Sequence, residues 1–361
     1  MRWPHLRVED ELVLLAARTD PTPTQLDRIE VLSRRASFED LAKRAAALNL
    51  VSLVYETLNR VDLAIDRAAL APLRARHTQN ALRNRVLSRQ LVAIARTLDE
   101  ARIEALTVKG VVLSALVYGS ETSRELGDLD WLVHARDVEA AARRIEALGY
   151  VRTQPIPRSR VEFSRRRDVR LEMPGPPMPV VLELHWKFKD TFFQLPEEAL
   201  WSNADTRAVD TYPVLTLTRT MTLVHLLHQL NYEAYPLRNL VDLAEAFRAF
   251  HGMVSYQELE SLISRFSLRR NLALALDAIV EALDRELPVE LREVRERLRE
   301  YDRPWLSWLV TDPRFLFDER ALAAKRDPRA RAAFSTLFLD EELVASLGAV
   351  ARRSILRKAG S

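Results

Sequence analysis

The stretch that decides the fold runs Arg124-Glu-Leu-Gly-Asp-Leu-Asp-Trp-Leu-Val133. Its last part is an apolar segment interrupted by two acids, Asp128 and Asp130. Side chains of a β-strand alternate between the two faces of a sheet, so both acids share one face. The apolar residues between and after them share the opposite face, which suits a core. We therefore expect a strand over 126–133 that presents two carboxylates on one side.

Two carboxylates on one strand edge repel each other unless a cation lies between them. A hard divalent cation meets this need, because Mg²⁺ usually binds one or two carboxylates together with substrate phosphates. A second apolar strand, expected over 180–186, contains a single acid, Glu183, on the same face as His185. If the two strands pair, three carboxylates converge as in a two-metal site for phosphoryl or nucleotidyl transfer. The alternative interpretation of the acids is a solvent-facing strand edge with salt bridges. His185 would orient a carboxylate or an acceptor, and a structural role is its alternative.

Upstream, Lys109-Gly110 joins a short strand beginning at Ala105 to a helix over 111–118. Glycine occurs only 8 times in 361 residues, so a glycine here marks a turn that needs one. Such a turn lets backbone amides approach an anion at the start of a helix, and Lys109 would add charge for a triphosphate. The plainer interpretation is a tight turn with a surface lysine. Arg124 could reach the same phosphates or pair with Asp128.

Several motifs in order resemble the signature of the uncharacterised nucleotidyltransferase family, a branch of the polymerase-β-like nucleotidyltransferase superfamily. The resemblance covers the run from Val108 to Val133, then Leu148-Gly-Tyr150, then Glu183-Leu-His-Trp186, and it continues in the helical segments 223–228 and 238–242. The wider superfamily has Gly-Ser or Gly-Gly at the turn where this chain has Lys-Gly, and a shorter gap to the paired acids.

The resemblance implies a transfer of a nucleoside monophosphate from an NTP to a hydroxyl or phosphate acceptor on a small molecule, peptide or protein. It implies Mg²⁺ or Mn²⁺ as cofactor, held by Asp128, Asp130 and Glu183. Glu183 would hold a second metal ion or deprotonate the acceptor. The nucleotide-binding set that follows from the same motifs comprises Lys109, Gly110, Ser114 and Arg124.

The surrounding periodicity predicts an α+β fold: a small mixed β-sheet flanked by helical parts. We expect a helical N-terminal region over 1–104, an α/β core over 105–215 and a helical C-terminal region over 216–361. Within the core, further strands are expected at 150–153 and 161–164.

Two groups of residues are candidates for the acceptor side. Arg165, Arg166 and Arg167 belong to a basic stretch near the strand expected at 161–164. The stretch would bind an anionic acceptor, and a plain solvated hairpin is the alternative interpretation. His225 and His228 lie at i and i+3 of a helix and, with Asp242, would border the acceptor or form a metal site. Helix-packing histidines are the alternative.

Composition narrows the class of protein. The net charge is 54 − 51 = +3, which is not that of a dedicated nucleic-acid binder. The chain has no cysteine, so disulfides, thiolate zinc sites and cysteine nucleophiles are excluded. No signal peptide or apolar stretch of about 18 residues is present, so we expect a cytoplasmic protein without a membrane partner. The alternatives to the proposed transferase are an RNA- or tRNA-modifying, toxin-like enzyme, a non-catalytic nucleotide-binding protein and a D-x-D glycosyltransferase.

Overall fold

The structure is a computed structural model that describes residues 3, 5–60, 65–157, 159–175, 178–189, 194–232, 236–301, 310–312 and 316–317. The chain forms two compact units. The first comprises Met1–Lys189, Leu195–Thr222 and Glu245–Phe250, and the second comprises Asp190–Gln194, Leu223–Ala244 and His251–Ser361. The domain boundaries expected at 104/105 and 215/216 stay predictions, and residues 318–361 of the expected C-terminal region lie outside the described part.

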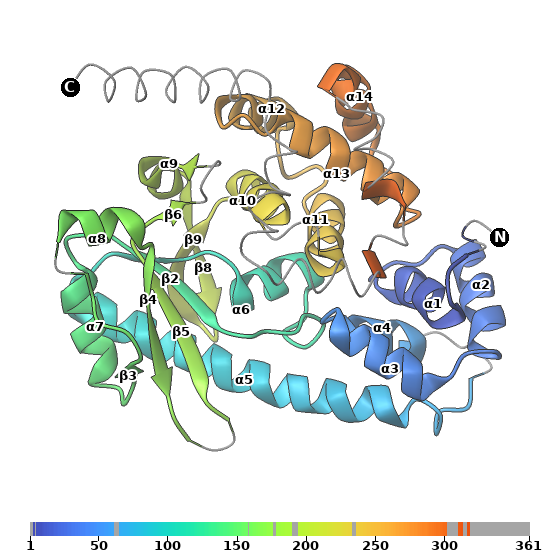
Figure 1. The fold of residues 1–361 in the computed structure, drawn as a ribbon, viewed down its shortest axis with the longest axis horizontal. Coiled ribbons are helices and arrows are strands. Elements are labelled where there is room, and N and C mark those ends of the chain that lie inside the picture. The colour runs from blue at the N-terminus through green and yellow to red at the C-terminus, as the bar shows by residue number, and fades with distance from the viewer. Residues whose placement is uncertain are drawn as a thin grey trace, which may run out of the picture. The chain divides into compact units, whose positions relative to one another are not determined.

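A seven-stranded mixed sheet lies at the centre of the first unit (Figure 1), in the order β3-β4-β5-β2-β1-β9-β8. Strand β2 pairs with β5, and β1 with β9, in parallel; the other neighbours are antiparallel. Its strands are β1 (Ala105–Thr107), β2 (Leu129–Val133), β3 (Val151–Arg152), β4 (Asp168–Met173), β5 (Val180–His185), β8 (Ala204–Val209) and β9 (Tyr212–Leu217). The short strands β6 (Phe188–Lys189) and β7 (Gln194–Leu195) lie outside it. The α+β class with a mixed sheet is confirmed.

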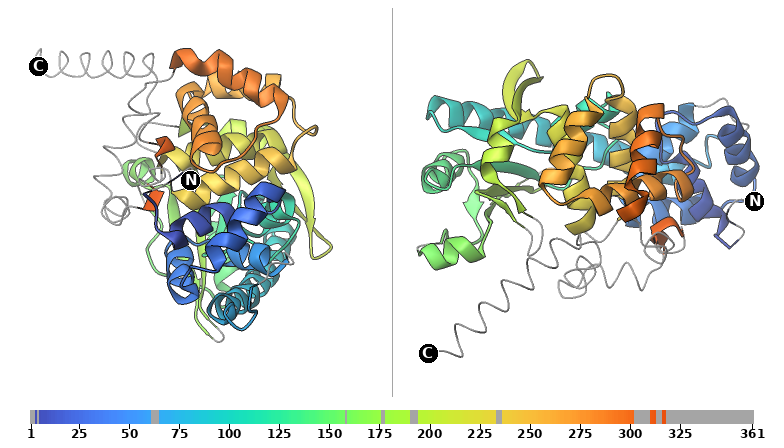
Figure 2. Two further views of the ribbon diagram at one scale, coloured as in Figure 1. Left: turned by 90° about the vertical axis from the view of Figure 1, so that its right-hand side faces the viewer. Right: turned by 90° about the horizontal axis from the view of Figure 1, so that it is seen from above.

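Helices cover one face of this sheet. The apolar side chains Leu129, Trp131 and Val133 of β2 form a core with α5 (Ala71–Glu100) and α7 (Val138–Glu146). Helix α5 runs along this face and continues past the sheet to α3 and α4 (Figures 1 and 2). Because side chains alternate along a strand, the residues between these core positions face the opposite side of the sheet. That side carries the candidate site.

The remaining helices precede and follow the strands along the chain. Those of the first unit are α1 (Val8–Ala16), α2 (Pro23–Ser33), α3 (Phe38–Ala47), α4 (Val51–Arg60), α6 (Gly110–Leu113), the π-helix η1 (Ser114–Tyr118), α8 (Arg160–Arg165) and α9 (Glu197–Ser202). Helices α10 (Arg219–Tyr232) and α11 (Leu237–Ala249) contribute residues to both units. The second unit continues with α12 (Tyr256–Arg265), α13 (Arg269–Glu281), α14 (Val289–Arg297) and η2 (Leu298–Tyr301). None of the described helices has both the length and the apolar character needed to cross a bilayer.

One local expectation was wrong, and one hairpin was not predicted. The segment 161–164 is helical, because Ser159 and Glu162 form a capping box: each side chain accepts a hydrogen bond from the other residue's backbone N–H. The strand that pairs with β5 lies further on, at β4. The sequence analysis also missed the hairpin of β8 and β9, whose turn residues Asp210 and Thr211 both have positive φ angles without being glycine.

Candidate functional site

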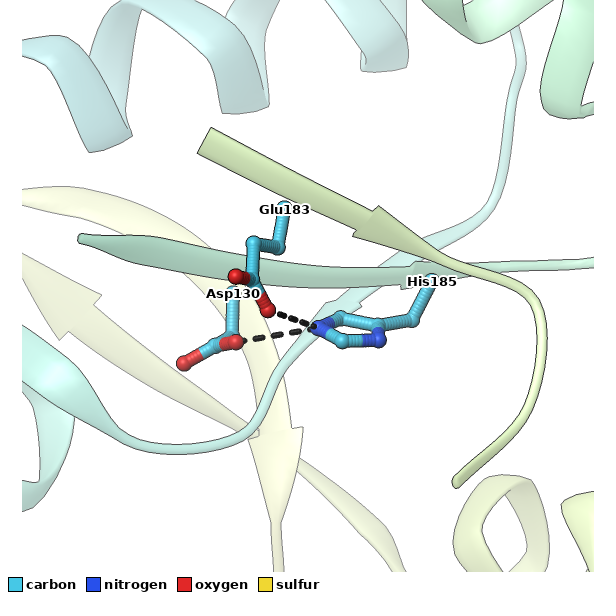
Figure 3. A group of neighbouring side chains, drawn as sticks. All are labelled: Asp130, Glu183 and His185. Atoms are coloured by element: carbon cyan, nitrogen blue, oxygen red, sulfur yellow. Dashed lines mark hydrogen bonds and ion pairs between the residues drawn. The ribbon is translucent and has the colours of Figure 1, made fainter. Parts of the chain in front are cut away.

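The site is built from two neighbouring strands. The parallel pairing of β2 and β5 places Asp130 opposite Glu183 and Leu132 opposite His185. Their side chains point to the face of the sheet away from α5, and both carboxylates converge on the same imidazole nitrogen (Figure 3). His185 Nε2 lies 3.0 Å from Asp130 Oδ1 and 3.5 Å from Glu183 Oε2. The expected pairing of the two acidic strands is therefore present, and it brings Glu183 next to Asp130.

Burial and charge act together on these three groups. Asp130 is 6% exposed and His185 2% exposed, whereas Glu183 is half-buried. Burial by itself would raise the pKa of Asp130, but the Lys109 ammonium and the His185 hydrogen bond outweigh it and hold the pKa far below its usual range. The hydrogen bond from His185 likewise lowers the pKa of Glu183. Burial lowers the pKa of His185, but its bonds to the two carboxylates raise the pKa overall.

Lys109 reaches the same carboxylate from the turn before α6. Its Nζ lies 3.2 Å from Asp130 Oδ2, so one oxygen of Asp130 contacts the Lys109 ammonium and the other contacts the His185 imidazole. Gly110 follows with φ +62°, a left-handed conformation that side chains rarely adopt. A Cβ at Gly110 would lie 3.8 Å from the Asp128 carbonyl oxygen, an ordinary contact, so conformation rather than space requires glycine. The turn thus directs Lys109 towards the acidic strand.

The other residues expected to bind nucleotide lie in or near the loop before β2. Ser114 is fully buried, and its hydroxyl donates to the Ser120 carbonyl at 2.7 Å. Arg124 is buried, with 6% of its surface exposed. Asp128 is half-buried and immediately precedes β2, but it is not part of the close group formed by Asp130, Glu183 and His185. Roles for Ser114, Arg124 and Asp128 in binding nucleotide or metal stay predictions.

Among the arginines expected on the acceptor side, Arg167 acts electrostatically on one of the carboxylates. Its charge lowers the pKa of Glu183, and its Nε lies 2.9 Å from Asp168 Oδ2. Arg166 donates to the Pro155 carbonyl, the Gln154 side chain and, at 3.2 Å, the backbone carbonyl of Asp168. The side chain of Arg165 lies outside the described part of the structure.

Asp168 is a site residue that the sequence analysis did not name. The register of β4 and β5 pairs it with His185, and its Oδ2 lies 3.8 Å from His185 Nδ1. The signal that would have found it is the alternation of Asp168, Arg170 and Glu172 with apolar residues. That pattern indicates a half-buried strand that begins at Asp168, whereas the strand was expected at 161–164.

His225, His228 and Asp242 are buried on α10 and α11. Arg238 lies near Asp242, with 4.0 Å between Nε and Oδ2. Among the described residues these three do not form a group with metal-ligand spacing, whereas Asp130, Glu183 and His185 do. Their expected place beside the acceptor stays a prediction.

The donor set at the carboxylates is suited to a divalent cation. One ligand atom from each of Asp130, Glu183 and His185 lies within 4.8 Å of the others. Two carboxylates fit Mg²⁺, and an added imidazole is also compatible with Mn²⁺.

Comparison with known proteins gives a family and distant structural likenesses. The family model described as uncharacterised nucleotidyltransferase matches residues 35–284. The crystal structure of ANT(2")-Ia in complex with adenylyl-2"-tobramycin is 12% identical, with a TM-score of 0.37 over 50% of this chain and 97% of that one. A nucleotidyltransferase-like protein from Paracoccidioides brasiliensis is 13% identical, with a TM-score of 0.34 over 56% of this chain and 94% of that one. These likenesses are too distant to assign a substrate. No curated protein matches the chain.

Proposed function

The chain belongs to the uncharacterised nucleotidyltransferase family, and from this premise we propose that it transfers a nucleoside monophosphate from an NTP to an acceptor, with Mg²⁺ or Mn²⁺ held at Asp130 and Glu183. The observation that carries the proposal is the register of β2 and β5, which sets these two carboxylates side by side on one face of the sheet. A bound divalent cation would neutralise the triphosphate and stabilise the charge that develops at the α-phosphorus.

The protein's own groups divide the remaining work. Asp130 is held ionised by Lys109 and His185, so it is ready to act as a ligand without first losing a proton. His185 fixes the orientation of both carboxylates through one nitrogen. Lys109 lies where its ammonium could contact a phosphate oxygen of an NTP bound over Asp130. Asp128 is the expected third carboxylate, from the end of the loop.

The reaction forms a bond between the acceptor oxygen and the α-phosphorus and breaks the bond from that phosphorus to the bridging oxygen of pyrophosphate. The acceptor proton passes to a carboxylate oxygen, for which we propose Glu183. Glu183 is half-buried, and its pKa is lowered, so it is ionised at neutral pH and able to orient a hydroxyl. Because Arg167 acts on the same carboxylate, an acceptor bearing negative charge is the class that this side of the site favours.

The experiment is incubation of the purified protein with each of the four α-labelled NTPs, with Mg²⁺ or Mn²⁺ and a panel of acceptors. We expect pyrophosphate release and label transfer with at least one pair. Asp130→Asn and Glu183→Gln should each lower the rate by about 100-fold or more, since each removes a charged ligand. Asp205→Asn is the matched control, because Asp205 is a carboxylate of the same sheet that is 41% exposed on β8 and pairs with Arg207.

Loss of activity in Asp130→Asn but not in Asp205→Asn supports the site. Tight NTP binding without transfer to any acceptor would indicate the non-catalytic nucleotide-binding protein instead. Label found only on added tRNA or other RNA would identify the RNA-modifying alternative. Full activity in both Asp130→Asn and Glu183→Gln would refute the assignment of these residues.

A further inference from the structure

The loop of residues 120–127, which connects η1 to β2, is held in place along almost its whole length. This loop carries Arg124 and leads directly into Asp128. A loop of this length at a surface normally bonds to water and exchanges between conformations. Here most of its residues bond to helices α4 and α5, which are distant in sequence.

Two asparagines of α5 make the central contacts. Asn84 Nδ2 donates to the carbonyl of Arg124 at 2.7 Å and also to the carbonyl of Glu121. Asn80 Nδ2 contacts the carbonyls of Thr122 at 3.1 Å and Arg124 at 3.4 Å. Asn84 is 1% exposed and Asn80 9% exposed, so these bonds are shielded from water. Both asparagines therefore converge on the peptide group of Arg124.

Helix α4 holds the same loop from a second side. Glu56 accepts hydrogen bonds from the hydroxyls of Thr122 (at 2.8 Å) and Ser123. One turn earlier on this helix, the backbone N–H of Ser52 donates to the Glu125 side chain at 3.1 Å. The Ser52 hydroxyl also accepts from Asn80 at 2.8 Å, which links the two helices to each other.

A third residue of α5, Arg83, also binds the loop. It donates to the carbonyl of Gly127 at 2.8 Å, next to Asp128. Positions 80, 83 and 84 are i, i+3 and i+4, so the three side chains share one face of α5. The helix thus presents a row of donors to loop carbonyls. If the loop only connected η1 to β2, its carbonyls could bond to water, and no asparagine side chains would have to be buried.

We propose that Asn80 and Asn84 are positioning residues for the nucleotide site, which hold the 120–127 loop so that Arg124 and Asp128 are in place before an NTP binds. This inference rests on the proposed function, because it assigns the loop to nucleotide binding. Preorganisation removes the cost of ordering a loop on binding, so it acts mainly on nucleotide affinity. Metal binding should change less than nucleotide binding, because Asp130 and Glu183 lie on strands and only Asp128, the expected third metal ligand, adjoins the loop.

The test compares Asn84→Ala with Ser88→Ala in the full-length chain. Ser88 is a suitable control because it lies one turn further along α5, is fully buried and loses one hydrogen bond, to Asp210 at 3.2 Å, away from the loop. Three quantities are measured: amide hydrogen exchange over 120–127, the dissociation constant for each Mg²⁺–NTP and the dissociation constant for Mn²⁺ alone. For Asn84→Ala we expect exchange of the loop and the NTP dissociation constant each to rise about tenfold, as for a locally opened segment. Neither should change in Ser88→Ala. The dissociation constant for Mn²⁺ should change less than that for the NTP in Asn84→Ala, and it should stay the same in Ser88→Ala.

If the loop exchanges faster but NTP affinity is unchanged, or if both variants behave alike, the positioning role is refuted. If the wild-type chain binds none of the four NTPs while it binds Mn²⁺, the proposed function fails, and the positioning role fails with it. If the wild-type chain binds an NTP and only the comparison of the variants fails, the positioning role alone is refuted. Should Asn84→Ala not fold, Glu56→Gln tests the same loop from α4. Unchanged exchange and NTP affinity in that variant would also refute the inference.

Discussion

Replacing Asp130 by asparagine should destabilise the metal-free protein. Repulsion between neighbouring acids alone would predict the opposite, because removing one charge would relieve it. The structure instead surrounds Asp130 with Lys109 at 3.2 Å and His185 at 3.0 Å. The substitution therefore removes the negative charge that faces the Lys109 ammonium and the His185 imidazole.

The magnitude follows from the two contacts. A hydrogen bond to a charged group contributes about 1.5–3 kcal/mol and a neutral one about 0.5–1.5 kcal/mol. Removing the carboxylate charge weakens both contacts, by roughly 2–3 kcal/mol in total. The Lys109 side chain is 22% exposed, so solvent screens its share and favours the lower value. For a unit of about 200 residues this corresponds to a fall in Tm of roughly 4–10 °C.

The assay is urea and thermal unfolding at pH 7 in the presence of EDTA. Asp205→Asn serves again as control and should change the free energy of unfolding by less than about 0.5 kcal/mol, as expected for an exposed ion pair. In a double-mutant cycle with Lys109→Met, the two losses should be less than additive by about 1 kcal/mol or more. An unchanged or raised Tm for Asp130→Asn would refute the view that Lys109 and His185 neutralise this carboxylate.

Three further predictions concern neighbouring groups. Lys109→Ala should weaken NTP binding more than Mn²⁺ binding in titrations of both, and Lys109→Arg should restore NTP binding only in part, because a planar guanidinium does not replace a compact ammonium. The raised pKa of His185 stabilises the fold at pH values below its unfolded pKa of about 6.5, and this contribution is lost as the pH rises through the higher folded value. In EDTA, unfolding free energies should therefore fall from pH 6 upwards more steeply in wild type than in His185→Gln; parallel curves would contradict this. Arg167→Glu should raise the KM of an anionic acceptor about tenfold with greater salt sensitivity. Arg166→Glu, whose side chain donates to Gln154 and to the carbonyls of Pro155 and Asp168, should not; equal effects of the two variants would contradict this prediction.

The acidic strands could be predicted from sequence because each carries its own pattern. Glu183 is the single acid of an apolar segment, and alternation alone places it and His185 on one face. Alternation does not reveal register, so the pairing of Asp130 with Glu183 depended on the assumption that the two strands are neighbours. The family resemblance supported that assumption, and the sheet order bears it out.

The parts that could not be predicted depend on contacts between distant segments. Nothing local in the sequence indicates that Asn84 bonds to the carbonyl of Arg124. The sequence around a helical asparagine does not tell whether its side chain is buried or exposed. Asp168 was missed for a different reason: a capping box was interpreted as strand, which moved the start of β4. Lys109 was expected to face phosphate, and its contact with Asp130 appears only when the turn at Gly110 is built in three dimensions.

Strand β5 receives its register from hydrogen bonds to β2 and β4, not from the length of chain that leads into it. The turn between β4 and β5 holds none of the site's side chains, and Gly175 within it is exposed. Exposed loop tips of this kind tolerate inserted sequence, because loop closure becomes only slowly more costly with length. A fluorescent or affinity module could therefore be inserted at Gly175 as a reporter, without a change in the spacing of the carboxylates.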